Sequence, residues 1–538
     1  MNDTIRLALA VAAAPADAAA RRAFAVALAK GGEARAALDQ YRALLALRPN
    51  DPDAAADMGL MARRCGREEE VLPVLRRAAD AHPRHARLWQ VLGLIYRSLD
   101  EMEASIASFD HAAALAPRDV LIAHGRARSL FDAGLPSAEC FEQAHRLAPH
   151  DKSVIAGLAA ALNGEGRSAD GATLLEEELA RAPTWWEGHA TLTRYRWAMG
   201  DRTGFTRSLE EALQSAPGDI DLWRELLITH IHANNYDAAL EIVARGRAVA
   251  GPHPMFDANE ATCHAELGNV EAADRLFAAI GPAADFTVTL RQVRHYMRTG
   301  RLVEAERLAV EATEAGEDAY WPYLATIWRM TGNPMWEWLE GDQRLVGTYD
   351  LYGAVGSMEA LAETLRSLHT SVQQPLDQSL RGGTQTDGML FSRLEPEVKR
   401  LRAAVKDAVT QHVAQLPPRD MKHPQLRHRR GSPVRFSGSW SVRLTSGGSH
   451  VNHIHPAGWF SSAFYVALPD ETRHGAAAAG WLTLGEPPAD LHLGVSPFRL
   501  VEPKPGQLVL FPSTMWHGTR PFAQGERMTV AFDVAPPV

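Results

Sequence analysis

The sequence predicts an α + β multidomain chain in which a helical repeat array precedes a small all-β domain. Two observations predict this order. Prolines recur at a nearly constant interval through the first part of the chain, and from about residue 434 the hydrophobic period changes from helical to two residues. At 538 residues the chain is also too long for a single hydrophobic core, so we expect two or three domains.

The prolines define the repeat. The intervals between them are 34, 34, 32, 34 and 34 residues, and most stand in Ala-Pro-x-Asp-like turns that close a helix. These prolines are Pro49, Pro83, Pro117, Pro149, Pro183 and Pro217. A period of 34 residues is that of the tetratricopeptide repeat, in which each unit is a pair of antiparallel helices.

One unit has the full tetratricopeptide pattern. Its positions are Trp89, Leu92, Gly93, Tyr96, Ser105, Phe109, Ala112 and Pro117. The small residues let the two helices approach, and the aromatic residues fill the groove between units. We expect eight or nine helical pairs up to about residue 340, stacked into a superhelix with a concave face. Such a face usually holds a peptide or protein segment; the alternative is a scaffold or dimerisation surface.

Composition narrows the classes of function. The chain has 56 basic and 65 acidic residues, a net charge of −9, which disfavours a bulk nucleic-acid-binding role. Its three scattered cysteines, Cys65, Cys140 and Cys263, do not form a disulfide scaffold and fit the reducing cytoplasm. Since no apolar run approaches the length of a membrane span, we expect a cytoplasmic protein without a membrane or nucleic-acid partner.

The last part of the chain is typical of short strands. Period-two runs cover residues 434–444, 462–468, 480–484, 508–511 and 527–534. Because Gly/Pro turns separate them and no helix intervenes, we expect a jelly-roll or cupin-type barrel.

An amphipathic helix is expected before the barrel. Over residues 394–416 the apolar side chains fall on one helical face, which predicts a helix that supports the sheet. We place the repeat superhelix at residues 1–345, a connecting segment at 346–375 and the barrel domain at 376–538. By composition, residues 378–386 are either a flexible linker or an ordered loop beside the barrel.

The barrel carries a set of histidines and one arginine. In an extended strand alternate side chains share a face, so His453 and His455 project the same way and His450 the other. His517 and Arg527 flank a turn-forming stretch, which predicts a hairpin in which they lie roughly opposite each other. Three imidazoles and a guanidinium suit a redox metal with open positions and an acidic co-substrate whose far carboxylate the guanidinium holds.

These residues resemble the double-stranded β-helix oxygenases that use Fe(II) and 2-oxoglutarate. Those enzymes have a His-x-Asp/Glu pair, a distal His, and an Arg or Lys some ten residues further on. The resemblance implies that His453 and His517 are metal ligands, that Arg527 binds the 2-oxoglutarate carboxylate, and that Thr529 assists it. In similar fusions of repeats and oxygenase, a segment like residues 378–386 belongs to the catalytic part, which favours the ordered loop.

Position 455 departs from the family pattern. Where the family usually has a carboxylate, this chain has His455. Either three histidines hold the iron, or His455 lies behind the ligands and another group or water completes the site.

Each candidate also has a plainer interpretation. For His453 and His517 it is a buried, hydrogen-bonded histidine, and for Arg527 it is an ion pair with Glu526 or Asp533. Because the arginine is in phase with the histidines, the ligand roles are favoured. Arg443, on a facing strand, is a further candidate for contact with substrate or co-substrate. The aromatic candidates either line the pocket or fill the barrel core; they are Trp459, Tyr465 and Trp516.

The resemblance implies a 2-oxoglutarate-dependent dioxygenase that hydroxylates a peptide or protein side chain recruited by the helical repeats. Two alternatives stay open. One is a non-catalytic protein-interaction scaffold with a vestigial metal-binding barrel. The other is an enzyme with the same barrel, another metal and no 2-oxoglutarate.

Overall fold

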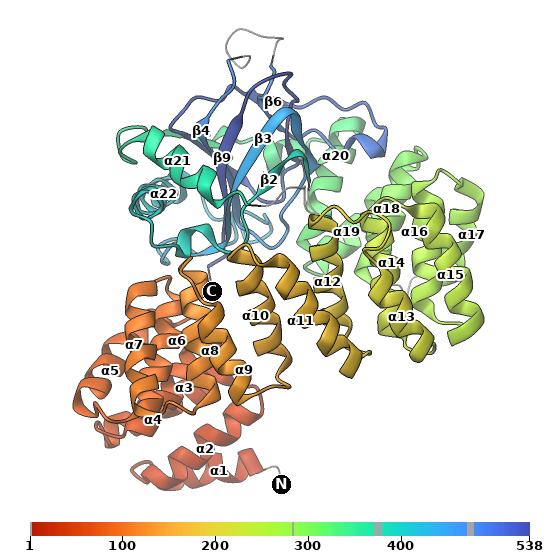
Figure 1. The fold of residues 1–538 in the computed structure, drawn as a ribbon. Helices are drawn as coiled ribbons and strands as arrows, with labels where there is room; N and C mark the ends of the chain where they lie inside the picture. The colour runs from red at the N-terminus through yellow and green to blue at the C-terminus, as the bar shows by residue number, and fades with distance from the viewer. Residues whose placement is uncertain (1–2, 282–284, 371–375, 377–378, 471–477, 538) are drawn as a thin grey trace. The chain divides into compact units, whose positions relative to one another are not determined.

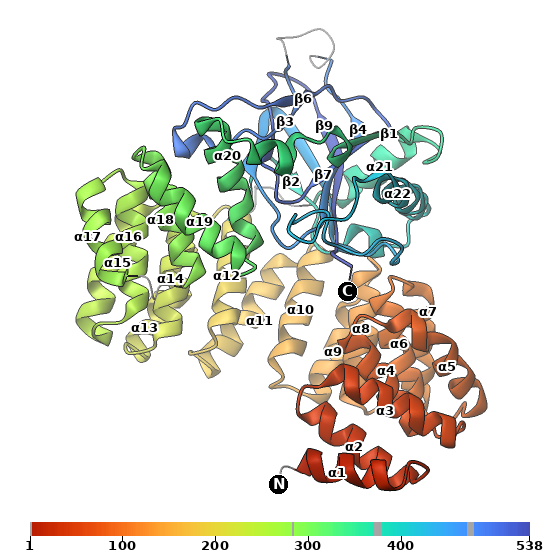
Figure 2. The ribbon, with the colours of Figure 1, turned by 180° about the vertical axis from the view of Figure 1, so that it is seen from behind.

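The computed structural model describes residues 3–281, 285–370, 376, 379–470 and 478–537 (Figure 1 and Figure 2). Within them the chain forms a helical repeat array followed by a curled sheet, as predicted. Contacts divide the chain into two compact units. The first holds residues up to 167 together with 391–394, and the second holds 168–390 and 395–537.

The first unit is made of helical hairpins. Its helices are α1 (Asp3–Ala13), α2 (Ala18–Lys30), α3 (Ala34–Leu47), α4 (Pro52–Arg64), α5 (Glu68–Ala81), α6 (Ala86–Ser98), α7 (Met102–Leu115), α8 (Val120–Asp132), α9 (Ala138–Leu147) and α10 (Lys152–Gly164). The Pro-x-Asp turns begin helices because the side chains of Asp51, Asp119 and Asp151 accept hydrogen bonds from the first-turn amides. A Cβ at Gly93 would lie 2.7 Å from the Phe109 ring, so the close approach of α6 and α7 requires glycine.

The second unit begins with further helical pairs. They are α11 (Ser168–Arg181), α12 (Trp186–Ala198), α13 (Arg207–Ser215), α14 (Ile220–His232), α15 (Tyr236–Ala250), α16 (Pro254–Glu266), α17 (Val270–Ile280), α18 (Phe286–Arg298), α19 (Leu302–Glu314) and the additional helix α20 (Trp321–Thr331). In sequence order, the eighteen helices from α2 to α19 agree with the eight or nine pairs predicted.

The same unit contains a nine-stranded sheet. Its strands are β1 (Gly347–Asp350), β2 (Leu380–Gln385), β3 (Phe436–His453), β4 (Phe460–Ala467), β5 (Leu482–Leu484), β6 (Arg499–Val501), β7 (Gln507–Pro512), β8 (His517–Thr519) and β9 (Arg527–Val534). The order is β1-β7-β4-β9-β3-β8-β5-β6, with β2 also paired to β3. Every described pairing is antiparallel. Each of the five predicted runs overlaps a strand of this sheet.

Strands β1, β2 and the short β6 lie where no strand was predicted. The stretch 346–375, expected to be a connecting segment, supplies β1, which pairs with β7, and helix α21 (Met358–Leu368). Residues 380–385 form β2, which pairs with β3, so this part of the expected loop is a strand; Gln378 lies outside the described residues. Because Gly382 and Gly383 give no periodic signal, the sequence pattern alone did not reveal β2.

The predicted hairpin between His517 and Arg527 is wrong. Strand β8 pairs with β3 and β5, whereas β9 pairs with β3 and β4, so the two strands lie on different stretches of β3. His517 is opposite His453, and Arg527 is opposite Leu444. The reason is that the long strand β3 has room for two partners along its length, and turn residues alone do not specify which strands they connect.

Helix α22 (Pro396–Gln415) confirms the amphipathic helix predicted before the barrel. Leu401, Val405 and Val409 are buried, and the helix contacts β7. The His412 ring also packs edge-on against Phe460 of β4, with 4.8 Å between ring centroids. The helix therefore supports the sheet, as predicted.

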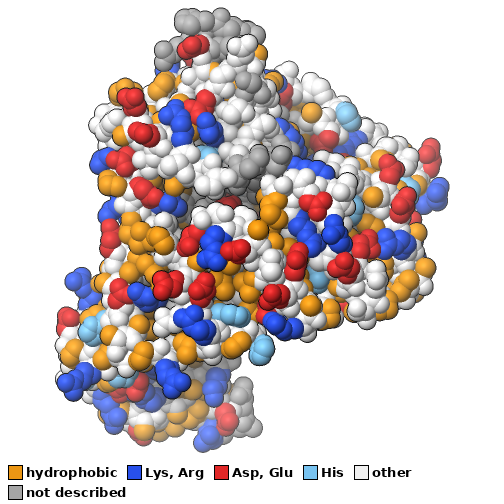
Figure 3. Space-filling view, in the orientation of Figure 1, with side chains coloured by type: hydrophobic (Ala, Val, Ile, Leu, Met, Phe, Trp, Pro, Cys, Tyr) orange, Lys and Arg blue, Asp and Glu red, His pale blue; other side chains and the backbone are white. Residues whose placement is uncertain are grey.

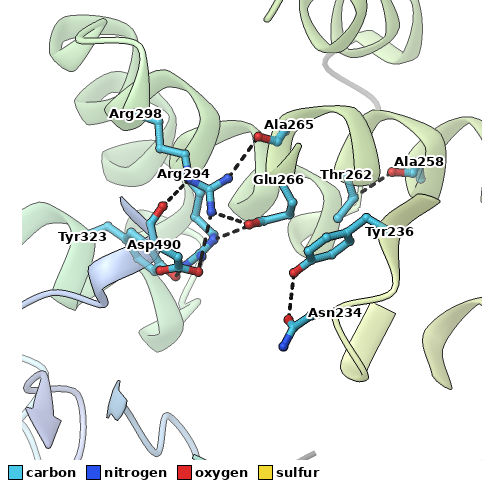
Figure 4. Close-up of polar contacts among 10 residues, drawn as sticks. All are labelled: Asn234, Tyr236, Ala258, Thr262, Ala265, Glu266, Arg294, Arg298, Tyr323 and Asp490. Carbon is cyan, nitrogen blue, oxygen red and sulfur yellow. Dashed lines mark hydrogen bonds and ion pairs between the residues drawn. The ribbon is translucent and has the colours of Figure 1, made fainter. Parts of the chain in front are cut away.

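A charged network joins the sheet to the helices of the second unit (Figure 4). Arg294 of α18 donates to Asp490 at 2.6 Å and lies 3.6 Å from Glu266 of α16. Arg298 donates to the backbone carbonyl of Asp490 at 2.8 Å and pairs with Glu266. Asp490 belongs to a short turn between β5 and β6, so two arginines of one helix hold a loop of the sheet.

The surface and the cysteines agree with the composition. On the face seen in Figure 3, acidic and basic side chains are interspersed over the helices. Cys65, Cys140 and Cys263 are free thiols. None of the helices in the described part of the chain has the length and apolarity needed to span a bilayer.

Candidate metal centre

Three histidines converge at one end of the sheet. His453 ends β3 and His517 begins β8, and the two are opposite each other in the antiparallel register, with 4.3 Å between ring centroids. His455 follows β3, and its backbone N–H donates to the Ser513 carbonyl at 2.9 Å. One nitrogen of each ring lies within 4.8 Å of one nitrogen of each of the other two. The spacing is that of a set of ligands around one ion.

Hydrogen bonds orient all three rings. The Nδ1 atoms of His453 and His517 lie 2.8 Å and 3.0 Å from the carbonyl oxygens of Val451 and Met515. Since a carbonyl only accepts, each Nδ1 carries the proton and each Nε2 carries a lone pair that can face a metal. Nδ1 of His455 lies 2.6 Å from Oδ2 of Asp533, and this contact likewise leaves the lone pair on Nε2. Metal-binding histidines are usually held in this way, so the donor set fits a divalent metal.

The rings of His453 and His517 are neutral at physiological pH. Burial, followed by the neighbouring His455, lowers the pKa of His453 to about 3. Burial and the two neighbouring imidazoles also lower the pKa of His517 well below its usual value. Neutral imidazole is the form that binds metal, so no proton has to be displaced at neutral pH.

Two further polar side chains lie beside the three histidines, and the sequence reasoning missed Ser379. Ser379 Oγ is 3.1 Å from Nδ1 of His450 and 3.2 Å from Nε2 of His453. His450 was predicted to face away, but the register of β3 shifts between His450 and His453, and this irregularity turns its ring into the same pocket. The feature of the sequence that could have revealed Ser379 is the glycine-rich segment that follows it.

Arg527 is buried in the same pocket. Its side chain is on β9 and only 2% of the residue is exposed. Nε donates to the Gly480 carbonyl at 3.2 Å, and the guanidinium lies 5.3 Å from the centre of the Tyr465 ring. Thr529, two residues on, lines the same pocket. Arg527, Thr529 and the three histidines are therefore brought together.

No carboxylate in the described part of the chain lies within ion-pair distance of Arg527. Of the two expected alternatives, Glu526 pairs with Arg366 and Arg443, and Asp533 pairs with His455. Burial lowers the pKa of Arg527, which is the response of a cation without an anionic partner. The pocket thus holds a positive charge that the described protein groups do not neutralise.

Other candidates lie elsewhere. Arg443 donates to Glu526 at 2.6 Å and does not line the pocket. Trp459, Tyr465 and Trp516 are buried and are not among the residues that line the pocket. Trp440 does line it, with its ring 5.5 Å from that of His455.

Comparisons with known families agree with both parts of the fold. Residues 438–533 match the family described as "Putative 2OG-Fe(II) oxygenase", and residues 86–119 match the tetratricopeptide repeat. The chain thus contains a tetratricopeptide repeat and a C-terminal region that matches that oxygenase family, as the motifs predicted. The match includes all three histidines, Arg527 and Thr529.

Individual relatives are more distant. The chain is similar to protein FlbA of Caulobacter vibrioides, with 27% identity over 266 residues. That match covers 45% of this chain and 43% of FlbA, so the chain spans less than half the length of this relative. Among solved structures, a tetratricopeptide repeat protein from Parabacteroides merdae covers 44% of this chain and 94% of its own, with 12% identity and a TM-score of 0.33. A thermophilic repeat protein from Thermus thermophilus covers 33% and 98%, with 18% identity and a TM-score of 0.29.

Proposed function

We propose that this protein is an Fe(II)- and 2-oxoglutarate-dependent dioxygenase that hydroxylates a peptide or protein side chain recruited by its helical repeats. His453, His455 and His517 would hold the iron, and Arg527 with Thr529 would hold the far carboxylate of 2-oxoglutarate. When bound, this pair of cofactors supplies oxidising power: 2-oxoglutarate and dioxygen give succinate and carbon dioxide, and one oxygen atom enters a substrate C–H bond.

The observation that carries the proposal is the buried guanidinium of Arg527, which has no carboxylate partner among the described residues and lies beside three metal-competent imidazoles. Burying an isolated charge is costly, so such a charge is usually matched by an anion. A dicarboxylate bound at the metal and reaching Arg527 would neutralise both the cation and the metal. The guanidinium fork suits a carboxylate because it can donate two parallel hydrogen bonds.

The chain's own residues have three tasks in this reaction. The carbonyls of Val451 and Met515 keep the lone pairs of His453 and His517 directed into the site. Arg527 sets the position of the co-substrate, and the buried strands around it keep water away. The tetratricopeptide repeats, which generally bind proteins, would bring the substrate.

Uncoupled turnover tests the proposal without a known substrate. The purified chain is titrated with Fe(II) and 2-oxoglutarate without oxygen while visible absorption is recorded, and succinate release is then measured in air. We expect an absorption band from the bound pair and slow, iron-dependent succinate release. His517→Ala should abolish both, and Arg527→Ala should raise KM for 2-oxoglutarate about 100-fold.

Two exposed residues provide matched controls. His150→Ala and Arg307→Ala remove the same types of side chain at exposed positions that do not line the pocket, and they should leave turnover unchanged. Absence of both band and succinate in the wild type would favour the non-catalytic interaction scaffold. Turnover that survives Arg527→Ala unchanged would refute the co-substrate assignment while leaving a metal enzyme of another kind.

A further inference from the structure

We infer that Asp533 is a positioning residue of the metal centre and that it supplies, through His455, the negative charge that a carboxylate ligand would otherwise bring. The inference rests on the metal site of the proposed function. It explains how the site can lack a carboxylate at position 455. A histidine stands there, and the carboxylate of Asp533 contacts that histidine from behind.

The contact between the two side chains is direct. Nδ1 of His455 lies 2.6 Å from Oδ2 of Asp533, a distance typical of a charge-assisted hydrogen bond. Asp533 is on β9 and is 9% exposed. Because the carboxylate accepts a hydrogen bond from Nδ1–H, Nε2 of His455 is the atom left for a metal.

Asp533 is itself held in place. Its Oδ1 lies 2.6 Å from Ser461 Oγ, and Ser461 is the register partner of Asp533 on β4. Ser461 Oγ is also 2.9 Å from Ser513 Oγ. A carboxylate only accepts hydrogen bonds, so the single O–H of Ser461 donates to Asp533. The Ser461 oxygen in turn accepts from the Ser513 hydroxyl. Ser461 and Ser513 are both buried. Since Oδ2 bonds to His455 and Oδ1 bonds to Ser461, both oxygens of the Asp533 carboxylate are hydrogen-bonded, and this fixes its orientation.

His455 differs from the other two histidines in this respect. Backbone carbonyls, which are neutral, orient His453 and His517. Of the three, His455 alone rests on a full negative charge, and it stands at the position where the resemblance expects an anionic ligand. A carboxylate behind a histidine raises its basicity and fixes its tautomer. The pocket is largely shielded from water, and charges attract each other more strongly there than in water. The single negative charge of Asp533 should therefore stabilise a divalent cation held by three imidazoles.

Cobalt(II) binding to the full, metal-free chain tests the inference, because it needs no turnover. Asp533→Asn keeps the shape and an oxygen that accepts from His455, but removes the charge. We expect it to weaken Co(II) affinity, measured by calorimetry, about 10- to 100-fold and to shift the visible Co(II) absorption. Asp350→Asn removes one charge from an exposed position on β1 and should leave both readouts unchanged.

A double-mutant cycle separates this role from a structural one. If Asp533 acts through His455, then Asp533→Asn should cause no further loss of affinity in a His455→Ala background. An equal loss in both backgrounds would overturn the inference. So would a single Asp533→Asn variant that binds Co(II) within about threefold of wild type, since the loss of such an outer partner of a metal ligand normally costs more.

Folding is checked by the melting temperature of each metal-free variant. Should Asp533→Asn not fold, Ser461→Ala keeps the carboxylate but removes its anchor, and it should weaken Co(II) binding in the same direction; unchanged affinity there would also overturn the inference. A wild-type chain that binds neither Co(II) nor Fe(II) refutes the proposed metal site as a whole. Wild-type binding with an ineffective Asp533→Asn refutes only the role of Asp533.

Discussion

Trp516 donates a hydrogen bond from Nε1 to the carbonyl oxygen of Pro322 at 3.1 Å, and so joins the strand of His517 to helix α20. Its indole lies edge-on to Tyr323, with 5.2 Å between ring centroids, and Nε1 is also 3.2 Å from Thr326 Oγ1. Trp516 is 3% exposed. The residue before a proposed metal ligand is therefore anchored in the last helix of the repeat region.

Replacing this indole should loosen the junction. Trp516→Ala should lower the free energy of unfolding of the second unit by about 3 to 5 kcal/mol, because it leaves a large cavity. Trp516→Phe keeps much of the volume but loses the hydrogen bond, so a smaller loss of about 1 to 2 kcal/mol is expected. Calorimetric melting provides the measurement, and Trp186→Ala at an exposed site should change little. Equal melting of the Trp516 and Trp186 variants would contradict the anchoring role.

The network around Glu266 should be sensitive to loss of its acid. Glu266 has 7% of its side-chain surface exposed and faces Arg294 and Arg298, which have 9% and 11%. Glu266→Ala leaves two nearly buried guanidiniums short of an anion, and we expect a loss of about 3 kcal/mol. Glu311→Ala, which breaks an exposed pair with Arg307, should cost less than about 1 kcal/mol. Similar melting temperatures for the two variants would show that solvent, and not Glu266, compensates the arginines.

Removing the charge of Arg527, in contrast, should not lower the stability of the metal-free protein if that charge serves to bind a ligand. Arg527→Met removes a buried cation that has no carboxylate partner among the described residues, so the metal-free protein should be as stable as wild type or gain about 1 kcal/mol. At the same time binding of 2-oxoglutarate should be lost. Melting temperature and calorimetric titration of 2-oxoglutarate into the Co(II)-loaded protein test the two halves separately. A clear fall in melting temperature would instead indicate a structural arginine.

Stability should fall in mild acid because His412 is buried as a neutral ring. Burial lowers its pKa to about 4, below the value of about 6.5 for a free imidazole. Between these two values the unfolded chain binds a proton that the folded chain does not, so unfolding becomes easier as pH falls from 6.5 toward 4. The contribution of this group is about 3 kcal/mol. His412 is 1% exposed, and its Nδ1 lies 2.9 Å from the Tyr349 hydroxyl.

The melting temperature of wild type and of His412→Gln, compared at pH 7 and pH 4.5, measures this contribution. The variant should lose less stability than wild type over this interval. His150→Gln, at an exposed position, should behave as wild type does. Parallel acid dependence in wild type and His412→Gln would assign the effect to other groups.

Local pattern was sufficient for the repeats and for most strands. The 34-residue proline interval works as a predictor because each repeat packs mainly against its neighbours, so the same small and aromatic residues recur. Gly93 and Phe109 are an example: their contact is the one that the pattern anticipates. The barrel was less predictable, because pairing along β3 connects residues far apart in sequence and β2 has no periodic signal.

The sequence by itself determined the two fold classes, the three histidines and the arginine, since these follow from periodicity and from residue types at family-like spacings. Only the tertiary structure decided which groups surround them. It placed His517 opposite His453 across β3 and β8, turned His450 into the pocket, and put Asp533 behind His455. The physical reason is that the position of a side chain in a barrel depends on strand register, and register is set by the packing of the whole sheet.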